Sequence, residues 1–389
     1  MTGARPRVMV FLHSFEPGGV ERVALRLCGA WAPLLEVQLV MGRTKGVMAA
    51  EAPAGLPLHI IGSGPLPTAG WETLWMMFVL ARQIRALRPD VLFAAGNSYA
   101  VVAVAMKLLL GRRCPPIVLK ISNDLGRADM PAPVRALYRL WCRVQGRLID
   151  HFTGLAPAMA TEIAAAMRVP PQRITIIDDP ALSEADHARL AAIGAARPAP
   201  GPASASASAS ASASGPGPGP GRRYVAIGRL AAQKNFARAI DAFALAARPG
   251  DTLAIIGEGS QRTRLERRIS ARGLAGRVSL PGHGDAVAAL AAADVFVLSS
   301  DYEALPAVVV EALASGLPVV ATDCCVSMRD LVGAFGSVVP PGDSAALAAA
   351  MVAQPLPDAP IRAAMAAAMQ RFTITTGART YAALFGRLA

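Results

Sequence analysis

The sequence contains few of the residues that mark several common classes of protein. Aromatic residues make up 5% of its 389 residues, which argues against a surface that stacks single-stranded nucleic acid. The five cysteines include no CxxC pair, so neither a zinc site nor a secreted disulfide framework is expected, and a reducing compartment fits better. No signal peptide is recognised, and the longest apolar run, Val91–Met106, is interrupted by Asn97 and Ser98. We therefore expect a cytoplasmic protein, either soluble or peripheral on the inner face of the plasma membrane.

Positive charge, in contrast, is in excess. The net charge is +12, and the excess is concentrated in residues 102–147. Such a balance favours an acidic partner, which could be nucleic acid, an anionic lipid surface or a phosphate-bearing substrate. Because the basic residues are not accompanied by aromatic ones, we expect no nucleic-acid partner.

The clearest landmark is a low-complexity segment over residues 198–221, in which Ala-Ser repeats are followed by Gly-Pro repeats. No packed core can be built from this composition, so the segment is expected to be a flexible linker. It predicts an N-terminal domain over residues 1–197 and a C-terminal domain over residues 222–389, whose last helix can pack back on the first domain.

Both predicted domains alternate short apolar strands with helices. Val8–Leu12 opens the first series and Tyr224–Ile227 opens the second. Continuous apolar strands separated by helices predict parallel sheets that are covered on both faces. We therefore expect two doubly wound α/β domains, with ligands bound in the cleft between them at the carboxyl ends of the strands.

Two glycine-containing motifs follow predicted strands. In residues 16–22, Gly18 and Gly19 allow the backbone to approach a phosphate at the start of a helix, although an ordinary turn is an equal alternative. Gly257–Gly259 begins like a dinucleotide-binding fingerprint. Because Arg262 occupies the position of the third glycine, we reject a dehydrogenase.

Charged side chains follow two other strands. Arg229 and Lys234 come after the first strand beyond the linker, next to Gly228, and two cations at a strand end suit a diphosphate. Glu303 follows a later apolar strand, and Glu311 lies in an apolar helix, where a lone carboxylate is costly to bury. Such carboxylates can accept hydrogen bonds from sugar hydroxyls. The alternative is that all four charges are solvated at the surface.

Together these motifs resemble a known family. The segments GGVER, GRLAAQKN and GEGSQRTRLE, and the Glu-x7-Glu pair in EALPAVVVEALASGLPVVATD, resemble the retaining glycosyltransferases of family GT4, also called glycosyltransferase group 1. The resemblance covers nearly the whole chain outside the linker and is most specific in the second half. It implies the GT-B fold: two Rossmann-like domains facing a central cleft, the first binding an acceptor and the second a nucleotide-diphosphate sugar.

The resemblance also implies roles for individual residues. Glu303, Arg229 and Lys234 form the catalytic set: Glu303 contacts the transferred sugar, while the two cations neutralise the diphosphate and make a metal or cofactor unnecessary. Glu311 binds the ribose hydroxyls, and Leu305 and Pro306 place backbone N–H groups at sugar or phosphate oxygens. The implied donor-binding residues are Gly18, Gly19, Gly228, Arg229, Lys234, Gly257, His283, Leu305, Pro306 and Glu311.

The chain departs from the family pattern at three places. Ala304 replaces a glycine, Asp179 replaces the asparagine that usually precedes the proline, and no histidine follows the strand at Ile117–Ile121. The acceptor-side polar group therefore stays open. Its candidates are Asn123, Asp124 and His13.

A basic helix is predicted around residues 131–150. Arg135, Arg139, Arg143 and Arg147 recur every four residues, with Trp141 among their apolar neighbours. Such a helix suits an anionic membrane surface, and a core-packed helix with a solvated arginine stripe is an equal alternative. The resemblance favours the membrane, because many members of the family use lipid-linked acceptors.

The predicted function is transfer of a sugar, of the hexosyltransferase type, from a nucleotide-diphosphate sugar to a glycan or lipid-linked acceptor. The expected setting is the synthesis of a bacterial surface polysaccharide, lipopolysaccharide or glycolipid. The alternatives are a non-catalytic scaffold that binds nucleotide sugars, and an epimerase or phosphorylase of the same architecture.

Overall fold

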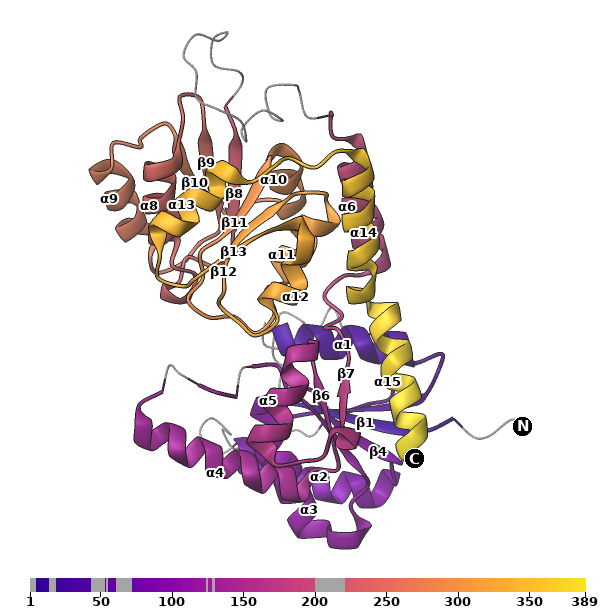
Figure 1. Ribbon diagram of the computed structural model, residues 1–389. Helices are drawn as coiled ribbons and strands as arrows, with labels where there is room; N and C mark the ends of the chain where they lie inside the picture. Colours follow the sequence, from indigo (N-terminus) through magenta and orange to yellow (C-terminus); the bar gives the residue numbers. More distant parts are fainter. Residues whose placement is uncertain are drawn as a thin grey trace. The chain divides into compact units, whose positions relative to one another are not determined.

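The computed structural model describes residues 5–13, 19–42, 53, 55–60, 72–123, 125–127, 130–199 and 221–389. The chain forms two compact units (Figure 1). The first contains residues up to Ala181 together with Phe372–Ala389, and the second contains Leu182–Arg371.

The first unit is built on a parallel sheet with the strand order β3-β2-β1-β4-β5-β6-β7. Its strands are β1 (Arg7–Leu12), β2 (Glu36–Met41), β3 (Leu58–Ile60), β4 (Val91–Ala94), β5 (Ile117–Lys120), β6 (His151–Gly154) and β7 (Ile174–Ile176). Its helices are α1 (Gly19–Trp31), α2 (Glu72–Leu87), α3 (Ala100–Leu110), α4 (Ala132–Leu148), α5 (Pro157–Met167) and α15 (Ile374–Leu388). Right-handed crossovers place α1 on one face of the sheet and α2 to α5 on the other.

The second unit is built on a parallel sheet with the order β10-β9-β8-β11-β12-β13. Its strands are β8 (Arg223–Ile227), β9 (Thr252–Ile256), β10 (Val278–Gly282), β11 (Val295–Leu298), β12 (Val319–Thr322) and β13 (Gly336–Val339). Its helices are α6 (Glu184–Ala196), α8 (Phe236–Ala246), α9 (Arg262–Ala271), α10 (Ala286–Ala292), α11 (Ala307–Ala314), α12 (Met328–Val332), α13 (Ser344–Ala353) and α14 (Ala359–Met369). This strand order is that of a doubly wound nucleotide-binding sheet.

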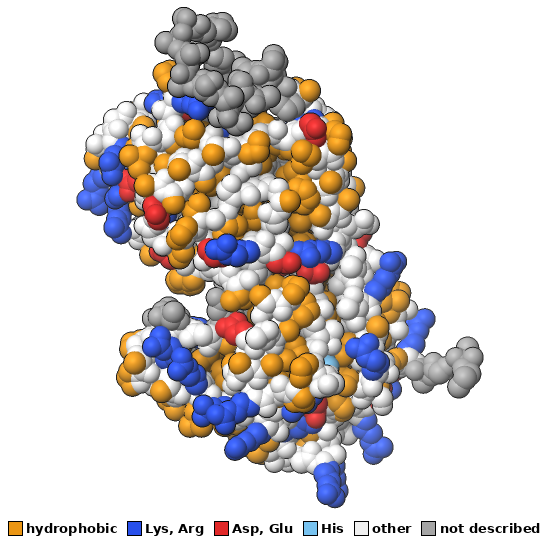
Figure 2. Space-filling model, in the orientation of Figure 1, with side chains coloured by type: hydrophobic (Ala, Val, Ile, Leu, Met, Phe, Trp, Pro, Cys, Tyr) orange, Lys and Arg blue, Asp and Glu red, His pale blue; other side chains and the backbone are white. Residues whose placement is uncertain are grey.

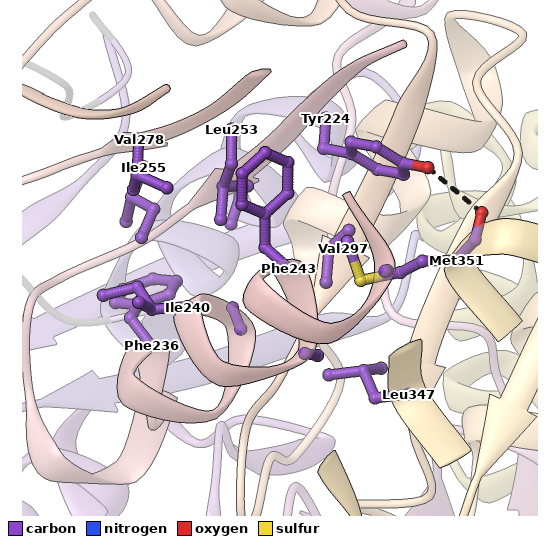
Figure 3. Packing of buried hydrophobic residues seen from close by; sticks show 14 of the residues in the cluster. Tyr224, Phe236, Ile240, Phe243, Leu253, Ile255, Val278, Val297, Leu347 and Met351 are labelled. Atoms are coloured by element: carbon purple, nitrogen blue, oxygen red, sulfur yellow. Dashed lines mark hydrogen bonds between the residues drawn. The ribbon is translucent and has the colours of Figure 1, made fainter. Parts of the chain in front are cut away.

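One core cluster of the second unit lies between its sheet and helices α8 and α13 (Figure 3). Phe243 packs edge-on against Tyr224, with 6.0 Å between the ring centroids. The Tyr224 hydroxyl donates to the backbone oxygen of Met351 at 3.2 Å, so the one polar atom of this ring is satisfied. The apolar strand pattern thus acts as predicted, by burying both faces of a parallel sheet.

The predicted parallel α/β organisation is confirmed in both units, with one strand added. The sequence pattern does not predict β13, because its Gly-Ser-Val-Val segment has only two apolar residues. It is recruited by backbone pairing with β12, in register from Val319↔Gly336 to Thr322↔Val339.

The boundary between the units differs from the predicted one. Helix α6, expected in the N-terminal domain, packs against α11 and α14 of the second unit. It is held there by Arg362, whose guanidinium donates to the backbone oxygens of Gly194 and Arg197 at 2.9 Å each. The low-complexity segment therefore joins two parts of the second unit, since α6 precedes it and β8 follows it. Residues 200–220 of that segment lie outside the described residues.

The C-terminal helix α15 belongs to the first unit. Trp31 of α1 donates its indole N–H to the backbone oxygen of Ala378 at 3.1 Å. Its ring also meets Tyr381 and Phe385 edge-on, with centroid distances of 5.6 and 5.2 Å. This aromatic contact buries the inner face of α15, which explains why so distant a segment joins the first unit.

Candidate active site

The second unit gathers charged and polar side chains at the carboxyl ends of its two central strands. Strand β8 leads into residues 228–234, and β11 leads into residues 299–303. The two strands are neighbours in the sheet, with Val295 opposite Tyr224. Because both run in the same direction, their following loops meet at one edge, where ligands of such sheets bind.

The centre of this edge is an ion pair between Lys234 and Glu303. The lysine Nζ lies 2.6 Å from Glu303 Oε1, and the two side chains are 18% and 9% exposed. Ser300 donates its hydroxyl to the same carboxylate oxygen at 2.7 Å, and Gln233 Nε2 donates to Oε2 at 3.4 Å. The Glu303 carboxylate is thus held by three side-chain donors, and its orientation is fixed before any ligand arrives.

Glycine is required beneath this pair. Gly228 has φ +156°, and a Cβ placed on it would lie 3.1 Å from Cε of Lys234, so the lysine stem crosses the glycine directly. Gly257, at φ +145°, would bring a Cβ to 2.0 Å from the backbone oxygen of Gly228. The turns after β8 and β9 therefore pack backbone to backbone.

Arg229 is the cation at this edge whose charge is not engaged. Its side chain is exposed, and none of the residues that the structure describes pairs with its guanidinium. Lys234, in contrast, already faces a carboxylate. The two cations that were predicted to act together on an anion therefore differ, because Lys234 is ion-paired and Arg229 has no partner among the described residues. An incoming anion meets Arg229 first.

Helix α11 starts next to Glu303. Its N-cap residue, Pro306, makes no side-chain cap hydrogen bond. The expectation that Pro306 supplies an N–H group is wrong, because proline has none. The free donors of the first turn belong to Ala307 and Val308, which have no acceptor within the helix. Glu311 lies further along α11 and is half-buried.

The connection between β9 and α9 carries a second ion pair. Arg262 donates to both oxygens of Glu258, at 2.6 and 2.8 Å, and to the backbone oxygen of Leu280 at 3.2 Å. The Arg262 guanidinium, and more weakly the charge of the exposed His283, lower the pKa of Glu258 below its usual value. The residue that breaks the dinucleotide fingerprint is therefore used to hold this turn.

The candidates in the first unit are more dispersed. His13, at the end of β1, stacks on Tyr99 with 4.9 Å between ring centroids. The Tyr99 hydroxyl in turn donates to Glu21 Oε1 at 2.8 Å. Asn123 is exposed, and Gly19 is the first residue of α1, with no atom within 4 Å of a Cβ built on it. Gly18 and Asp124 lie outside the described residues.

Sequence reasoning missed four polar residues of these edges. Ser300 and Gln233 hold Glu303, and their signal was their place beside Glu303 and Lys234 in the same motifs. In the first unit, Asn97 accepts the Ser122 backbone N–H at 2.7 Å, and no sequence pattern marks that contact.

The predicted basic helix is α4, and its apolar side chains are divided between two faces. Gly146 packs so closely on α5 that a Cβ would lie 1.8 Å from the backbone oxygen of Met167. On the outside, Val134, Leu137 and Leu140 are 49%, 68% and 54% exposed. The helix therefore packs on α5 at Gly146 and leaves three large apolar residues at the surface.

The arginines of α4 lie beside this exposed apolar surface (Figure 2). Arg139, Arg143 and Arg147 are exposed, while Arg135 and Trp141 are half-buried. Within the described part of the chain, no helix combines the length and the apolar character needed to cross a bilayer.

Two family models match the chain. The model described as "Glycosyltransferase Family 4" matches residues 17–179, and the one described as "Glycosyl transferases group 1" matches residues 221–354. Together they match most of each unit, and they leave out β1, α6, α14, α15 and residues 198–220.

Curated relatives match shorter segments. The lipopolysaccharide core biosynthesis glycosyltransferase LpsE of Rhizobium meliloti is 39% identical over 99 residues, which are 25% of this chain and 28% of LpsE. The amylovoran biosynthesis glycosyltransferase AmsD of Erwinia amylovora is 30% identical over 118 residues, which are 30% of this chain and 34% of AmsD. The match thus spans about a third or less of the length of these relatives.

Solved structures match the whole chain. Anabaena HepE (Alr3699), crystallised with UDP and glucose, is similar with a TM-score of 0.70 at 19% identity, over 98% of this chain and all of HepE. The lipopolysaccharide outer core galactosyltransferase WaaB, in its apo form, gives a TM-score of 0.70 at 16% identity, over 98% and 100% of the two chains. These similarities confirm the predicted GT-B fold.

Proposed function

Because the chain belongs to the family 4, or group 1, glycosyltransferases, we propose that it moves a sugar from a nucleotide-diphosphate sugar to a hydroxyl of a glycan or lipid-linked acceptor. The observation that carries this proposal is the pairing of Lys234 with Glu303 beside the unpaired Arg229. A carboxylate for sugar hydroxyls and two cations for a diphosphate stand at one edge of one sheet, which is what a sugar diphosphate requires.

Charge development on the leaving group determines what each residue does. When the bond between the sugar and the diphosphate breaks, the electron pair stays on the phosphate oxygen. Arg229, the first-turn N–H groups of α11 and Lys234 stabilise that negative charge without a metal. Glu303 orients the sugar through its hydroxyls, and Glu311 binds the ribose. Gly257 and His283 lie toward the nucleoside end of the donor.

The first unit binds the acceptor in this account, and transfer retains the anomeric configuration of the sugar. HepE was crystallised with UDP, which supports a nucleotide-sugar donor. The names of LpsE and AmsD support a role in the synthesis of lipopolysaccharide or exopolysaccharide.

The test is release of nucleotide from a panel of UDP-, GDP- and ADP-sugars, with and without membrane lipid extract as the source of acceptor. The proposal predicts release from one donor that depends on the extract, is lost in Glu303→Gln and is unchanged by a metal chelator. Conversion of a donor sugar without acceptor would instead indicate an epimerase. Binding without release under every condition would indicate a scaffold.

We further propose that α4 rests on an anionic membrane surface. Its exposed Leu137 and Leu140 supply apolar area, and Arg139 and Arg143 beside them supply positive charge. Sedimentation with vesicles rich in phosphatidylglycerol should show binding that weakens with salt and in Leu137→Ser. The matched control is Arg264→Gln, which removes an exposed arginine from α9 and should leave binding unchanged. Equal binding by all three proteins would contradict this role.

A further inference from the structure

The two loops of the candidate site are joined by hydrogen bonds that do not involve the charged groups of Lys234 and Glu303. The backbone N–H of Asp301 donates to the backbone oxygen of Gln233 at 2.9 Å. The Gln233 side chain donates to the backbone oxygen of Tyr302 at 2.9 Å, and the Ser299 hydroxyl donates to that of Lys234 at 3.0 Å. The loop after β8 and the loop after β11 are therefore hydrogen-bonded to each other along their length.

The Asp301 carboxylate also joins the two loops. It accepts from Arg238 Nη2 at 2.7 Å and from Asn235 Nδ2 at 3.1 Å at each oxygen. Arg238 also donates to the backbone oxygen of Ser299 at 2.9 Å, and its side chain is only 10% exposed. The charge of this arginine is thus directed at the loop after β11, where it is not available to a ligand.

Asn235 makes this contact instead of the usual side-chain contact of an N-cap residue. It is the N-cap residue of α8, yet its side chain makes no cap hydrogen bond. It also has a left-handed backbone, with φ 41° and ψ 48°, a conformation that asparagine tolerates better than most residues. An asparagine at an N-cap normally accepts from the first turn of its helix. Here its amide donates to Asp301 instead.

We propose that Asp301, held by Arg238 and Asn235, is a positioning residue that sets the separation of the Lys234 ammonium and the Glu303 carboxylate. It touches neither group. It acts because Asn235 directly follows the lysine and Asp301 comes two residues before the glutamate. This inference rests on the proposed function, since it assigns the cluster of Asp301, Arg238 and Asn235, here called the clamp, a role in sugar transfer.

The test compares four substitutions, at Asp301, Arg238 and Asn235, with one matched control. Asp301→Asn and Arg238→Gln should each lower kcat about tenfold and change the donor KM by less than about threefold. The flexible lysine stem still reaches a phosphate, whereas the carboxylate loses its orientation. Arg238→Lys should restore part of kcat. Asn235→Gly keeps the left-handed turn and should lower kcat about threefold without loss of thermal stability.

The control is Asp294→Asn. Asp294 pairs with Arg223 at 2.7 Å and joins the same two strands, β8 and β11, at their amino ends. The Asp294→Asn substitution should shift the unfolding temperature as much as Asp301→Asn does, but it should leave kcat unchanged. A kcat within twofold of wild type in Asp301→Asn, or a loss in both variants that follows the loss of stability, would overturn the proposal. A wild-type protein that releases no nucleotide from any donor would contradict the proposed function itself.

Discussion

Lysine–carboxylate pairs occur at the carboxyl edges of both sheets, but their roles differ. In the first unit, Lys120 ends β5 and pairs with Asp179, and the lysine is only 2% exposed. In the second unit, the Lys234–Glu303 pair lies beside the exposed Arg229 and an uncapped helix start. The Asp179 and Lys234 side chains are each 18% exposed, so burial alone does not distinguish the two pairs. The difference lies in the surroundings, since the exposed Arg229 and the uncapped start of α11 lie beside the second pair.

The largest effect on turnover is expected from loss of the Lys234 ammonium group. Lys234→Ala should lower kcat about 100- to 1,000-fold, because charge on the leaving diphosphate loses a preorganised cation. Donor turnover measures it, and Arg264→Ala on α9 is the control for loss of an exposed charge from the same unit. A decrease of less than threefold would place the cation outside the reaction.

The corresponding change in the first unit should act on stability. Lys120→Met leaves Asp179 without its partner and should cost about 3 kcal/mol or more of unfolding free energy. Lys107→Met, which breaks the more exposed pair with Asp150, should cost no more than about 1 kcal/mol. Urea unfolding measures both. Equal midpoints for the two variants would show that burial does not distinguish these pairs.

A smaller effect is expected from His151, a buried titratable group of the first unit. Burial, and then the positive charges of Arg387 and Arg173, lower the pKa of His151 to about 4. The unfolded chain binds a proton below about pH 6.5 while the folded chain does not. The contribution of His151 to stability should therefore be constant above about pH 6.5, and stability should fall by about 3 kcal/mol toward pH 4.

His151→Gln should flatten this decline, because residue 151 of the variant no longer titrates in either state. Thermal unfolding at pH 4.5 and 7.5 measures the difference. An equal loss of stability in both proteins would assign the acid sensitivity to other groups.

The smallest effect is expected at residues 200–220. Both flanks of this segment belong to the second unit, so halving its length should change the unfolding free energy by only about 0.6 kcal/mol and leave kcat unchanged. Denaturant unfolding and donor turnover of the shortened chain measure this. If the segment were instead the connection between the units, turnover should change with its length.

The sequence predicts the second unit better than the first for a physical reason. In the proposed function, Glu303, Lys234 and Gly228 hold a diphosphate and a sugar, which would constrain residue types at fixed spacing and leave a recognisable motif. The assignment of α6 to the second unit cannot be predicted from such a motif. It depends on backbone carbonyls that Arg197 and Arg362 contact, and those carbonyls are the same in every sequence.

The supporting contacts of the site are equally hard to predict. Asp301 and Arg238 are ordinary charged residues in the sequence, and only the adjacency of β8 and β11 brings them together. Acceptor residues in the first unit are harder still, because an acceptor hydroxyl needs only one polar group and leaves no spacing to recognise.

The most direct test of the account is calorimetric titration of the wild-type protein, Lys234→Ala and Arg229→Ala with UDP, GDP and ADP. We predict that the wild type binds one of the three and that each substitution weakens that binding at least tenfold. Undiminished binding in both variants would contradict the assignment of the diphosphate to the edge formed by β8 and β11.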